Sequence, residues 1–298
     1  MRKSAAIALA ALLVFPPATR AIVIAGGNGT QNSSAPADDP GFGNVASNGV
    51  YLGNYGGNYW AITATHVGAG NMVLDGLTYN YVPGSAVTVL NSDSSASDLT
   101  LFRISSDPGL ATLALAGTNP GTNAVVRFVG DGLKEDAFTQ WTINTATNPD
   151  TWTVVGSGGD AGGYTEVSGT GMRWGDAVVA GATTVDISGR TTATFYTEFL
   201  NAAGSTQGAT GDSGGAVFYK TGGTWYLAGI MSAVGTYNNG TTPDGQPANT
   251  AVFTNLTFAA SMADYSGFIA TAIPEPSTYV LLAGLVALAV AAIIRRWK

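Results

Sequence analysis

The chain of 298 residues contains no cysteine, a single histidine and only 10% charged residues. The missing cysteine excludes disulfide bonds, thiolate metal sites and cysteine nucleophiles. One histidine, His66, excludes a metal centre built from several histidines of one chain. The 12 Lys and Arg residues face 19 Asp and Glu, a net charge of −7, which argues against nucleic acid as a partner because phosphate binding needs clustered basic side chains. These exclusions make His66 the residue to follow.

Glycine is abundant, with 41 residues, and the sequence is 45% hydrophobic. The apolar residues form short runs separated by Gly, Asn, Asp and Pro, which predicts an all-β fold with many turns. The glycine-dense stretch 156–175 is expected to be mobile, and a helix is expected over about 257–270 because Phe258, Met262, Tyr265 and Ile269 recur at helical spacing. The expected strands are 50–55, 59–64, 79–82, 86–90, 99–104, 124–129, 151–155, 192–199, 215–219, 225–232 and 251–255.

The N-terminus is typical of a secretory signal peptide. Arg2 and Lys3 precede an apolar stretch over 5–15, and small residues follow near Ala21. The expected cleavage site is after Ala21, which makes 1–21 the signal peptide. An N-terminal membrane anchor is the less favoured alternative, because the apolar stretch is short.

The C-terminus has the pattern of a sorting signal. Pro274-Glu275-Pro276 precedes an apolar segment over 279–294, and Arg295-Arg296-Trp297-Lys298 ends the chain. The 16 apolar residues would span roughly 24 Å as a helix, enough to cross a membrane with flanking residues that snorkel, and the basic end should stay cytoplasmic. Residues 273–298 resemble the PEP-CTERM sorting signal of Gram-negative bacteria. The resemblance implies an exosortase-like partner that cleaves the tail, whereas the plain alternative is a permanent single-pass anchor.

The part of the chain between these two ends is strongly acidic. The end segments hold six of the 12 basic residues and one of the 19 acidic ones. Residues 22–273 therefore carry a net charge of −12, which favours solubility and repels nucleic acid and anionic lipid. We expect contact with the membrane only through the C-terminal segment.

The sharpest local motif is Gly-Asp-Ser-Gly-Gly at 211–215, followed by the apolar run 216–219. Glycines around Ser213 allow its hydroxyl to be exposed and nearby backbone N–H groups to converge on one oxyanion position. A serine is a poor nucleophile without a positioned base. The chain offers only His66 for that role, at the end of the apolar run 59–64.

A third group would have to orient the imidazole and stabilise the imidazolium ion. Asp98 is the best candidate because it precedes the alternating run 99–104, although Asp93 and Asp107 lie nearby in sequence. Each of these motifs could be a turn or an ordinary surface residue if it were taken alone. The order His66, Asp98, Ser213 makes a coincidence improbable.

The chain resembles the trypsin/chymotrypsin-like serine peptidases in three strings. They are Thr63-Ala64-Thr65-His66, Asp98-Leu99-Thr100-Leu101 and Gly211-Asp212-Ser213-Gly214-Gly215. The resemblance implies two packed six-stranded antiparallel β-barrels, over 22–112 and 113–272, with the triad in the cleft between them. The short C-terminal helix and the two end segments would complete the chain.

The resemblance implies an exported serine endopeptidase that works through an acyl-enzyme intermediate and needs no cofactor or metal. Ser213 would attack a peptide carbonyl, His66 would act as the base, Asp98 would orient His66, and the N–H groups of Gly211 and Ser213 would hold the oxyanion. It also places Gln207 and Ser232 in the substrate-binding site. Asp212 would pair with the amine of Ile22 that signal cleavage after Ala21 releases, since 22–27 resemble the family's mature start.

Gln207 at the family's specificity position is neither acidic nor apolar, which favours small or medium neutral substrate side chains. The alternative to the peptidase is a catalytically inactive trypsin-like surface or matrix binding protein. An esterase of the α/β-hydrolase type is excluded by chain order, because its histidine should follow the serine. The two end signals predict export from a Gram-negative-type bacterium, with the protein at the cell surface or secreted and transiently anchored in the membrane.

Overall fold

The computed structural model describes residues 22–168, 171–236, 245–273 and Arg295. The described chain is predominantly β, with one α-helix and one short 3-10 helix, which confirms the predicted all-β class. The predicted signal peptide 1–21 and membrane segment 279–294 lie outside the described residues.

The first half of the chain forms a five-stranded antiparallel sheet in the order β2-β3-β4-β8-β7. Alternate residues of these strands face two cores. Val50, Leu52, Ile62 and Leu101 are fully buried in one core, and Tyr51 and Phe102 are fully buried in the other. The separate hairpin β5-β6 packs beside it. The strands are β2 Val45–Ala46, β3 Gly49–Tyr55, β4 Asn58–Ala64, β5 Met72–Leu74, β6 Leu77–Tyr79, β7 Val87–Leu90 and β8 Ala96–Ile104.

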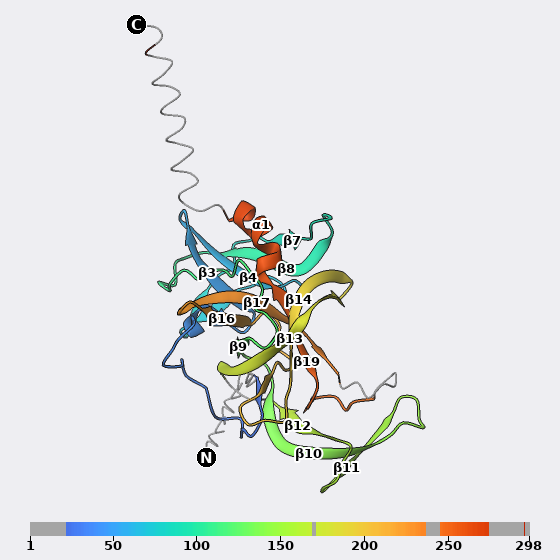
Figure 1. Ribbon diagram of the computed structural model, residues 1–298. Helices are drawn as coiled ribbons and strands as arrows, with labels where there is room; N and C mark the ends of the chain where they lie inside the picture. The colour runs from blue at the N-terminus through green and yellow to red at the C-terminus, as the bar shows by residue number, and fades with distance from the viewer. Residues whose placement is uncertain (1–21, 169–170, 237–244, 274–294, 296–298) are drawn as a thin grey trace, which may run out of the picture.

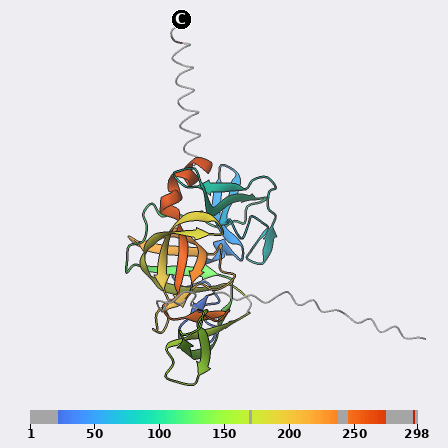
Figure 2. The same cartoon turned by 90° about the vertical axis from the view of Figure 1, so that its right-hand side faces the viewer.

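The second half forms a closed six-stranded antiparallel barrel in the order β13-β14-β19-β17-β16-β9, seen from the side in Figure 2. Phe128, Phe195 and Val217 fill part of its interior. The chain thus has one closed barrel and one open five-stranded sheet, where the sequence predicted two six-stranded barrels. The barrel strands are β9 Val125–Gly130, β13 Arg173–Ile187, β14 Arg190–Glu198, β16 Ala216–Thr221, β17 Thr224–Gly235 and β19 Leu256–Ser261.

A four-stranded sheet in the order β11-β10-β12-β18 extends below the barrel in Figure 1. A T-shaped contact between the rings of Trp141 and Trp152, with centroids 6.0 Å apart, joins β10 to β11. The stretch 156–175, expected to be mobile, contains β12 and the first residues of β13. The strands are β10 Lys134–Asn144, β11 Thr151–Val155, β12 Ala161–Val167 and β18 Thr250–Val252.

The first described residues pair with a strand from the second half of the chain. Strand β1, Val23–Ile24, pairs with β15, Thr206–Gln207, and places Val23 opposite Gln207. The 3-10 helix η1, Phe42–Asn44, then leads into the five-stranded sheet. The N-terminal segment therefore lies beside the loop that carries the Gly-Asp-Ser-Gly-Gly motif.

The predicted helix exists but begins five residues late. Residues 257–261 belong to β19 instead. This strand is hydrogen-bonded to β14 on one side and to β17 on the other. The helix α1, Met262–Ala272, starts where Ser261 accepts a hydrogen bond from the N–H of Asp264 at 3.0 Å. Tyr265 and Ile269 are buried as predicted, and Figure 1 shows α1 next to β7.

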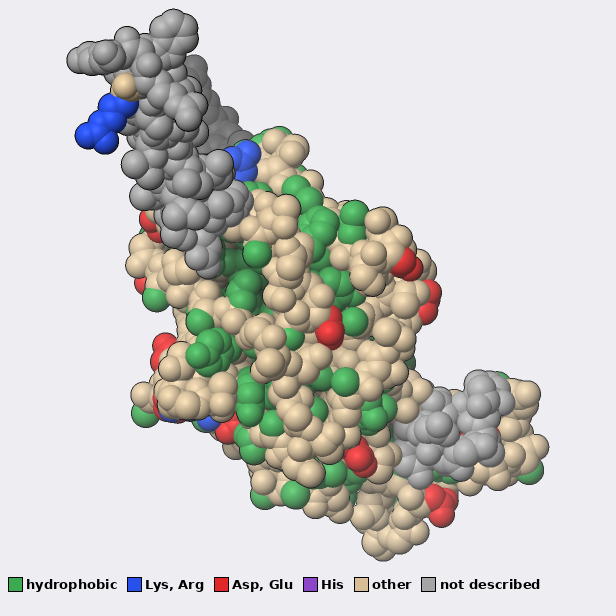
Figure 3. All heavy atoms as spheres, turned by 45° about the horizontal axis from the view of Figure 1, so that its top comes forward, with side chains coloured by type: hydrophobic (Ala, Val, Ile, Leu, Met, Phe, Trp, Pro, Cys, Tyr) green, Lys and Arg blue, Asp and Glu red, His purple; other side chains and the backbone are tan. Residues whose placement is uncertain are grey.

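Charged side chains are sparse on the surface of this fold. On the face drawn in Figure 3, acidic side chains are scattered singly and few basic ones are visible. This distribution agrees with the small share of charge in the sequence and offers no clustered basic patch on that face.

Candidate active site

Pairing between two strands of the first half brings His66 and Asp98 together. Ala64 at the end of β4 lies opposite Leu99 in the antiparallel strand β8. His66, which follows β4, and Asp98, which precedes Leu99, therefore lie close together. The N–H of Thr65 donates to the carbonyl of Asp98 at 3.0 Å, and the N–H of His66 donates to Asp98 Oδ1 at 3.0 Å. These two hydrogen bonds fix the backbone of His66 relative to Asp98, and with it the position from which the imidazole extends.

The imidazole of His66 makes a short contact with the same carboxylate, with 2.7 Å between Nδ1 and Asp98 Oδ2. An ionised carboxylate can only accept, so Nδ1 carries the proton and Nε2 is left as the acceptor. Asp98 is fully buried, whereas the His66 side chain is 26% exposed. The backbone N–H of Asp98 in turn donates to Thr192 Oγ1 in β14 at 2.9 Å, a contact from the second half of the chain.

The other two nearby carboxylates that the sequence left open lie elsewhere. Asp93 accepts hydrogen bonds from the N–H and hydroxyl of Ser95. Asp107 accepts from Asn54 Nδ2 at 3.2 Å. Among the described residues neither forms a hydrogen bond or ion pair with His66, and of the three carboxylates only Asp98 contacts the imidazole.

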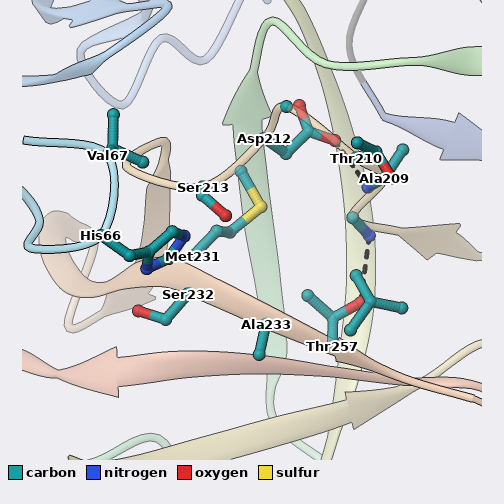
Figure 4. A pocket seen from close by; sticks show the side chains of 13 residues that line it. His66, Val67, Ala209, Thr210, Asp212, Ser213, Met231, Ser232, Ala233 and Thr257 are labelled. Carbon is teal, nitrogen blue, oxygen red and sulfur yellow. Dashed lines mark hydrogen bonds between the residues drawn. The ribbon is translucent and has the colours of Figure 1, made fainter. Parts of the chain in front are cut away.

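Ser213 and His66 line one cavity of about 500 Å³. His66 and Val67 come from the first half of the chain, and the other lining residues come from the second. In Figure 4 the side chains of Ser213 and His66 lie near each other at one end of this cavity. No hydrogen bond joins Ser213 Oγ to His66 among the described residues, a separation that is common for such pairs before a substrate binds.

The loop that holds Ser213 leaves two backbone donors free. The N–H of Gly214 donates to the carbonyl of Met231 at 2.8 Å, and that of Gly215 donates to the carbonyl of Asp212 at 2.9 Å. Among the described residues, no acceptor takes the N–H of Gly211 or Ser213. Positive φ angles at Gly211 (96°) and Gly214 (89°) shape this loop, in the left-handed region that favours glycine.

Asp212, next to Ser213, is buried and its carboxylate is held by backbone donors. Its buried carboxylate accepts the N–H groups of Ile22 at 3.2 Å, Gly132 at 2.8 Å and Ala209 at 2.8 Å. Burial raises the pKa of Asp212 to about 7, and these three hydrogen bonds oppose the rise. The structure thus brings Ile22 and Asp212 into contact through the backbone N–H of Ile22.

The two predicted substrate-binding residues occupy different positions. Ser232, in β17, lines the cavity with Ser213 and donates its hydroxyl to the carbonyl of Ile230 at 3.1 Å. Figure 4 shows it on the same side as His66. Gln207, in β15, lines an adjoining cavity instead.

A buried ion pair that sequence reasoning missed holds the N-terminal segment. Glu135 and Arg173 are almost wholly buried and joined by two contacts of 2.9 Å. Glu135 accepts the N–H groups of Ile24 and Gly29 at 3.1 and 2.9 Å, while Arg173 donates to the carbonyls of Ile22 and Gln31. Neither Glu135 nor Arg173 belongs to a local sequence motif. The only signal in the sequence is that each is a charged residue in a chain with only 10% charged residues.

Comparisons with known proteins gave one match to a family model, at the C-terminus, and several similar solved structures. The model of the PEP-CTERM protein-sorting motif matches residues 272–296. Similar solved structures include the inactive form of the Rv3671c protease, 16% identical over 73% of this chain and 83% of that chain with a TM-score of 0.37. The active form, from M. tuberculosis, is 17% identical over 73% of each chain with a TM-score of 0.39.

No curated protein sequence matches the chain. Among the described residues, no helix has the length and hydrophobicity needed to cross a membrane; the apolar segment 279–294 is not among them. The family match covers the Pro-Glu-Pro triplet and the apolar segment after it. The C-terminus of this chain is therefore a PEP-CTERM protein-sorting motif, as its sequence predicted.

Proposed function

We propose that the chain is an exported serine endopeptidase in which His66, Asp98 and Ser213 form the catalytic triad. The observation that carries the proposal is the 2.7 Å contact between His66 Nδ1 and the buried Asp98 carboxylate, in a cavity that Ser213 also lines. A carboxylate on Nδ1 leaves Nε2 as a base directed at the cavity, which is the requirement for activating a serine hydroxyl.

The reaction begins when Ser213 Oγ attacks the carbonyl carbon of a peptide bond and its proton passes to His66 Nε2. The negative charge that develops on the carbonyl oxygen is held by the free N–H groups of Gly211 and Ser213. His66 then gives the proton to the leaving amine, and the acyl group stays on Ser213. A water molecule, deprotonated by His66, hydrolyses the acyl-enzyme by the reverse sequence of steps. Asp98 stabilises the imidazolium ion in each half-reaction.

Cleavage after Ala21 would complete the site. In the uncleaved chain the nitrogen of Ile22 is an amide that donates a single N–H to Asp212. A freed Ile22 amine would be a cation 3.2 Å from a carboxylate whose burial penalises its charge, so pairing would stabilise both ions. Because Asp212 precedes Ser213, this pair would secure the loop that presents the two oxyanion donors.

The proposal divides the chain between its two ends into two parts, 22–112 and 113–272. The first would supply His66 and Asp98, and the second would supply Ser213. The PEP-CTERM motif indicates export, and we assign 273–298 to recognition by an exosortase-like enzyme in a Gram-negative-type bacterium. The segment 279–294 would anchor the protein in the membrane until the tail is cleaved.

Labelling of the purified protein with a fluorophosphonate probe tests the catalytic assignment. The wild-type protein should be labelled at Ser213, and Ser213→Ala should not be labelled. Asp93→Asn, an exposed change in the same half as His66, serves as a control that should retain labelling. An unlabelled wild-type protein would favour the inactive binding protein, and equal labelling of Ser213→Ala would remove Ser213 from the mechanism.

A further inference from the structure

Asp98 lies at a point where strand β8 departs from regular pairing with β7. Thr88 pairs with Thr100 and the next pair is Leu90 with Ala96. Between these pairs, one residue of β7 faces three residues of β8, which forms a β-bulge. Asp98 is the middle one of the three, so its backbone N–H takes an acceptor from outside this sheet.

That acceptor is the hydroxyl of Thr192, near the start of β14 in the second half of the chain. Thr192 Oγ1 accepts the N–H of Asp98 at 2.9 Å and donates its own proton to the carbonyl of Arg190 at 3.2 Å. Donation to Arg190 leaves the oxygen lone pairs for Asp98. Thr192 and Asp98 are both fully buried, so removal of the hydroxyl would leave a buried N–H without a partner.

The residues on either side of Thr192 are held by Tyr265 of α1 and by Asn91 in the turn between β7 and β8. The N–H of Ala193 donates to the Tyr265 hydroxyl at 2.9 Å, and that hydroxyl donates to Asn91 Oδ1 at 2.8 Å. Asn91 Nδ2 in turn donates to the carbonyl of Thr191 at 2.8 Å. These three hydrogen bonds close a ring that includes the backbone of Thr192.

The Tyr265 hydroxyl keeps its proton near neutral pH, so the ring stays intact there. Tyr265 is only 3% exposed. Burial raises the pKa of Tyr265 above its ordinary value, and the charges of Asp264 and Asp98 add to the rise. Hydrogen bonds with Ala193 and Ser97 oppose it. Tyr265 is therefore a neutral donor that lies close enough to Asp98 to interact with its charge.

We propose that Thr192 and Tyr265 are positioning residues for the carboxylate of Asp98; the inference rests on the proposed triad. Thr192 holds the backbone of Asp98 directly, and Tyr265 holds the part of β14 that carries Thr192. The carboxylate can then accept from the N–H of His66 at 3.0 Å and contact its Nδ1 at 2.7 Å at the same time. Catalytic groups need to be held within about 0.5 Å of their working geometry, which one strand with a bulge does not ensure alone.

This network also joins the two halves of the chain that supply the triad. His66 and Asp98 come from the first half, whereas Ser213, Thr192 and Tyr265 come from the second. The hydrogen bond from Asp98 to Thr192 opposes a shift of one half against the other. It therefore keeps the imidazole in place relative to Ser213 as well as to its own carboxylate.

Substitution of Thr192 separates positioning from general stability. Thr192→Val keeps the shape of the side chain but removes the acceptor, and should slow fluorophosphonate labelling by up to about 100-fold, as expected for a misplacement of about 1 Å. Thr192→Ser keeps the hydroxyl and should label at nearly the wild-type rate. Thr194→Val is the matched control, because Thr194 is buried on the same strand and donates to the carbonyl of Thr183 at 2.9 Å. It loses one buried hydrogen bond and should still label normally.

The imidazole of His66 gives a second readout, which a loss of stability alone would not change. His66 is the only histidine, so isotope-labelled histidine gives one imidazole in the NMR spectrum. At a pH where this imidazole is neutral, the wild-type protein and Thr194→Val should carry its proton on Nδ1, because Asp98 accepts it. Thr192→Val should show a mixture of the two tautomers, because the carboxylate is no longer held beside Nδ1.

The two readouts separate failure of this inference from failure of the proposed function. If the wild-type protein is labelled and Thr192→Val is labelled as fast as Thr194→Val, the positioning role is wrong and the peptidase stands. An unchanged tautomer in Thr192→Val would overturn the positioning role at any labelling rate. If the wild-type protein is not labelled, the proposed function fails, and the tautomers still decide whether Thr192 positions the carboxylate.

If Thr192→Val does not fold, Tyr265→Phe provides the second test. It keeps the ring of the side chain and removes the hydroxyl that joins β14 to the β7–β8 turn, so labelling should slow and the second tautomer should appear. Tyr51→Phe is its control, because Tyr51 is also buried and its hydroxyl lies 3.5 Å from Asp107. The wild-type tautomer and labelling rate in Tyr265→Phe would overturn the inference.

Discussion

The backbone N–H of Ile22 donates to Asp212 Oδ2 at 3.2 Å, across 190 positions of the sequence. This contact links the residue after the expected signal cleavage site to the residue before the candidate nucleophile. Because Asp212 is buried and lacks an ion-pair partner among the described residues, its ionisation should respond to whether the Ile22 amine is free.

We predict that a chain uncleaved before Ile22 loses stability as pH rises from about 4 to about 7. The pKa of Asp212 is raised from 3.8 to about 7, so the folded chain binds this proton more tightly than the unfolded chain, and the free energy of unfolding falls across that window. The loss should reach a few kcal/mol. Urea unfolding of Ser213→Ala at pH 5 and pH 8 measures it.

Two controls isolate the contribution of Asp212. Asp212→Asn should flatten the pH dependence, and Glu166→Gln should remove only a separate contribution of the same sign, since the pKa of Glu166 is also raised to about 7. A chain cleaved after Ala21 should lose less stability over the same window, because the Ile22 amine pairs with the carboxylate. An equal slope in the cleaved and uncleaved chains would contradict the pairing.

Arg173→Met should destabilise the protein by about 3–5 kcal/mol, because it leaves the Glu135 charge buried and unpaired. The double variant Glu135→Gln with Arg173→Met should be less destabilised than Arg173→Met alone. Urea unfolding of the two single variants and the double variant gives the interaction energy of the pair. Additive effects would show that the two side chains do not depend on each other.

Asp98→Asn should lower the rate of fluorophosphonate labelling on the order of 10⁴-fold, because an amide can donate to Nδ1 and stabilise the wrong imidazole tautomer. The fold should persist, since Asn has nearly the same shape as Asp. Asp93→Asn is the matched control and should label within about twofold of the wild type. Normal labelling of Asp98→Asn would remove Asp98 from the triad. His66→Ala should abolish labelling, because the chain has no other histidine.

Gly214→Ala should disrupt the loop that holds Ser213. The φ angle of Gly214 is 89°, and a Cβ there would lie 2.9 Å from Thr63 Oγ1. Gly223→Ala is the matched control, since its φ is 82° and nothing lies within 4 Å of the added Cβ. Both variants bear the cost of the left-handed backbone, but only Gly214→Ala should also lose labelling. Equal labelling of the two would show that the close approach to Thr63 has no catalytic consequence.

The strand predictions agreed best with the structure where the strands are largely apolar and buried. The run 59–64 became β4, and 50–55 became most of β3, because alternate residues such as Val50 and Ile62 face the same interior. Strands β10 and β12 were missed. They carry polar residues such as Gln140 and Thr165. They are stabilised by pairing with each other, β10 also with β11 and β12 also with the distant β18.

The sequence by itself determined the predominantly β class, the sorting motif and the local strings around His66, Asp98 and Ser213, because each depends on residues close together in the chain. Tertiary structure decided which carboxylate meets the imidazole and which half of the chain forms a closed barrel. It also decided that Glu135 and Arg173 hold the N-terminal segment. Those outcomes depend on strand register and on burial of charge among distant residues, and neither leaves a local pattern in the sequence.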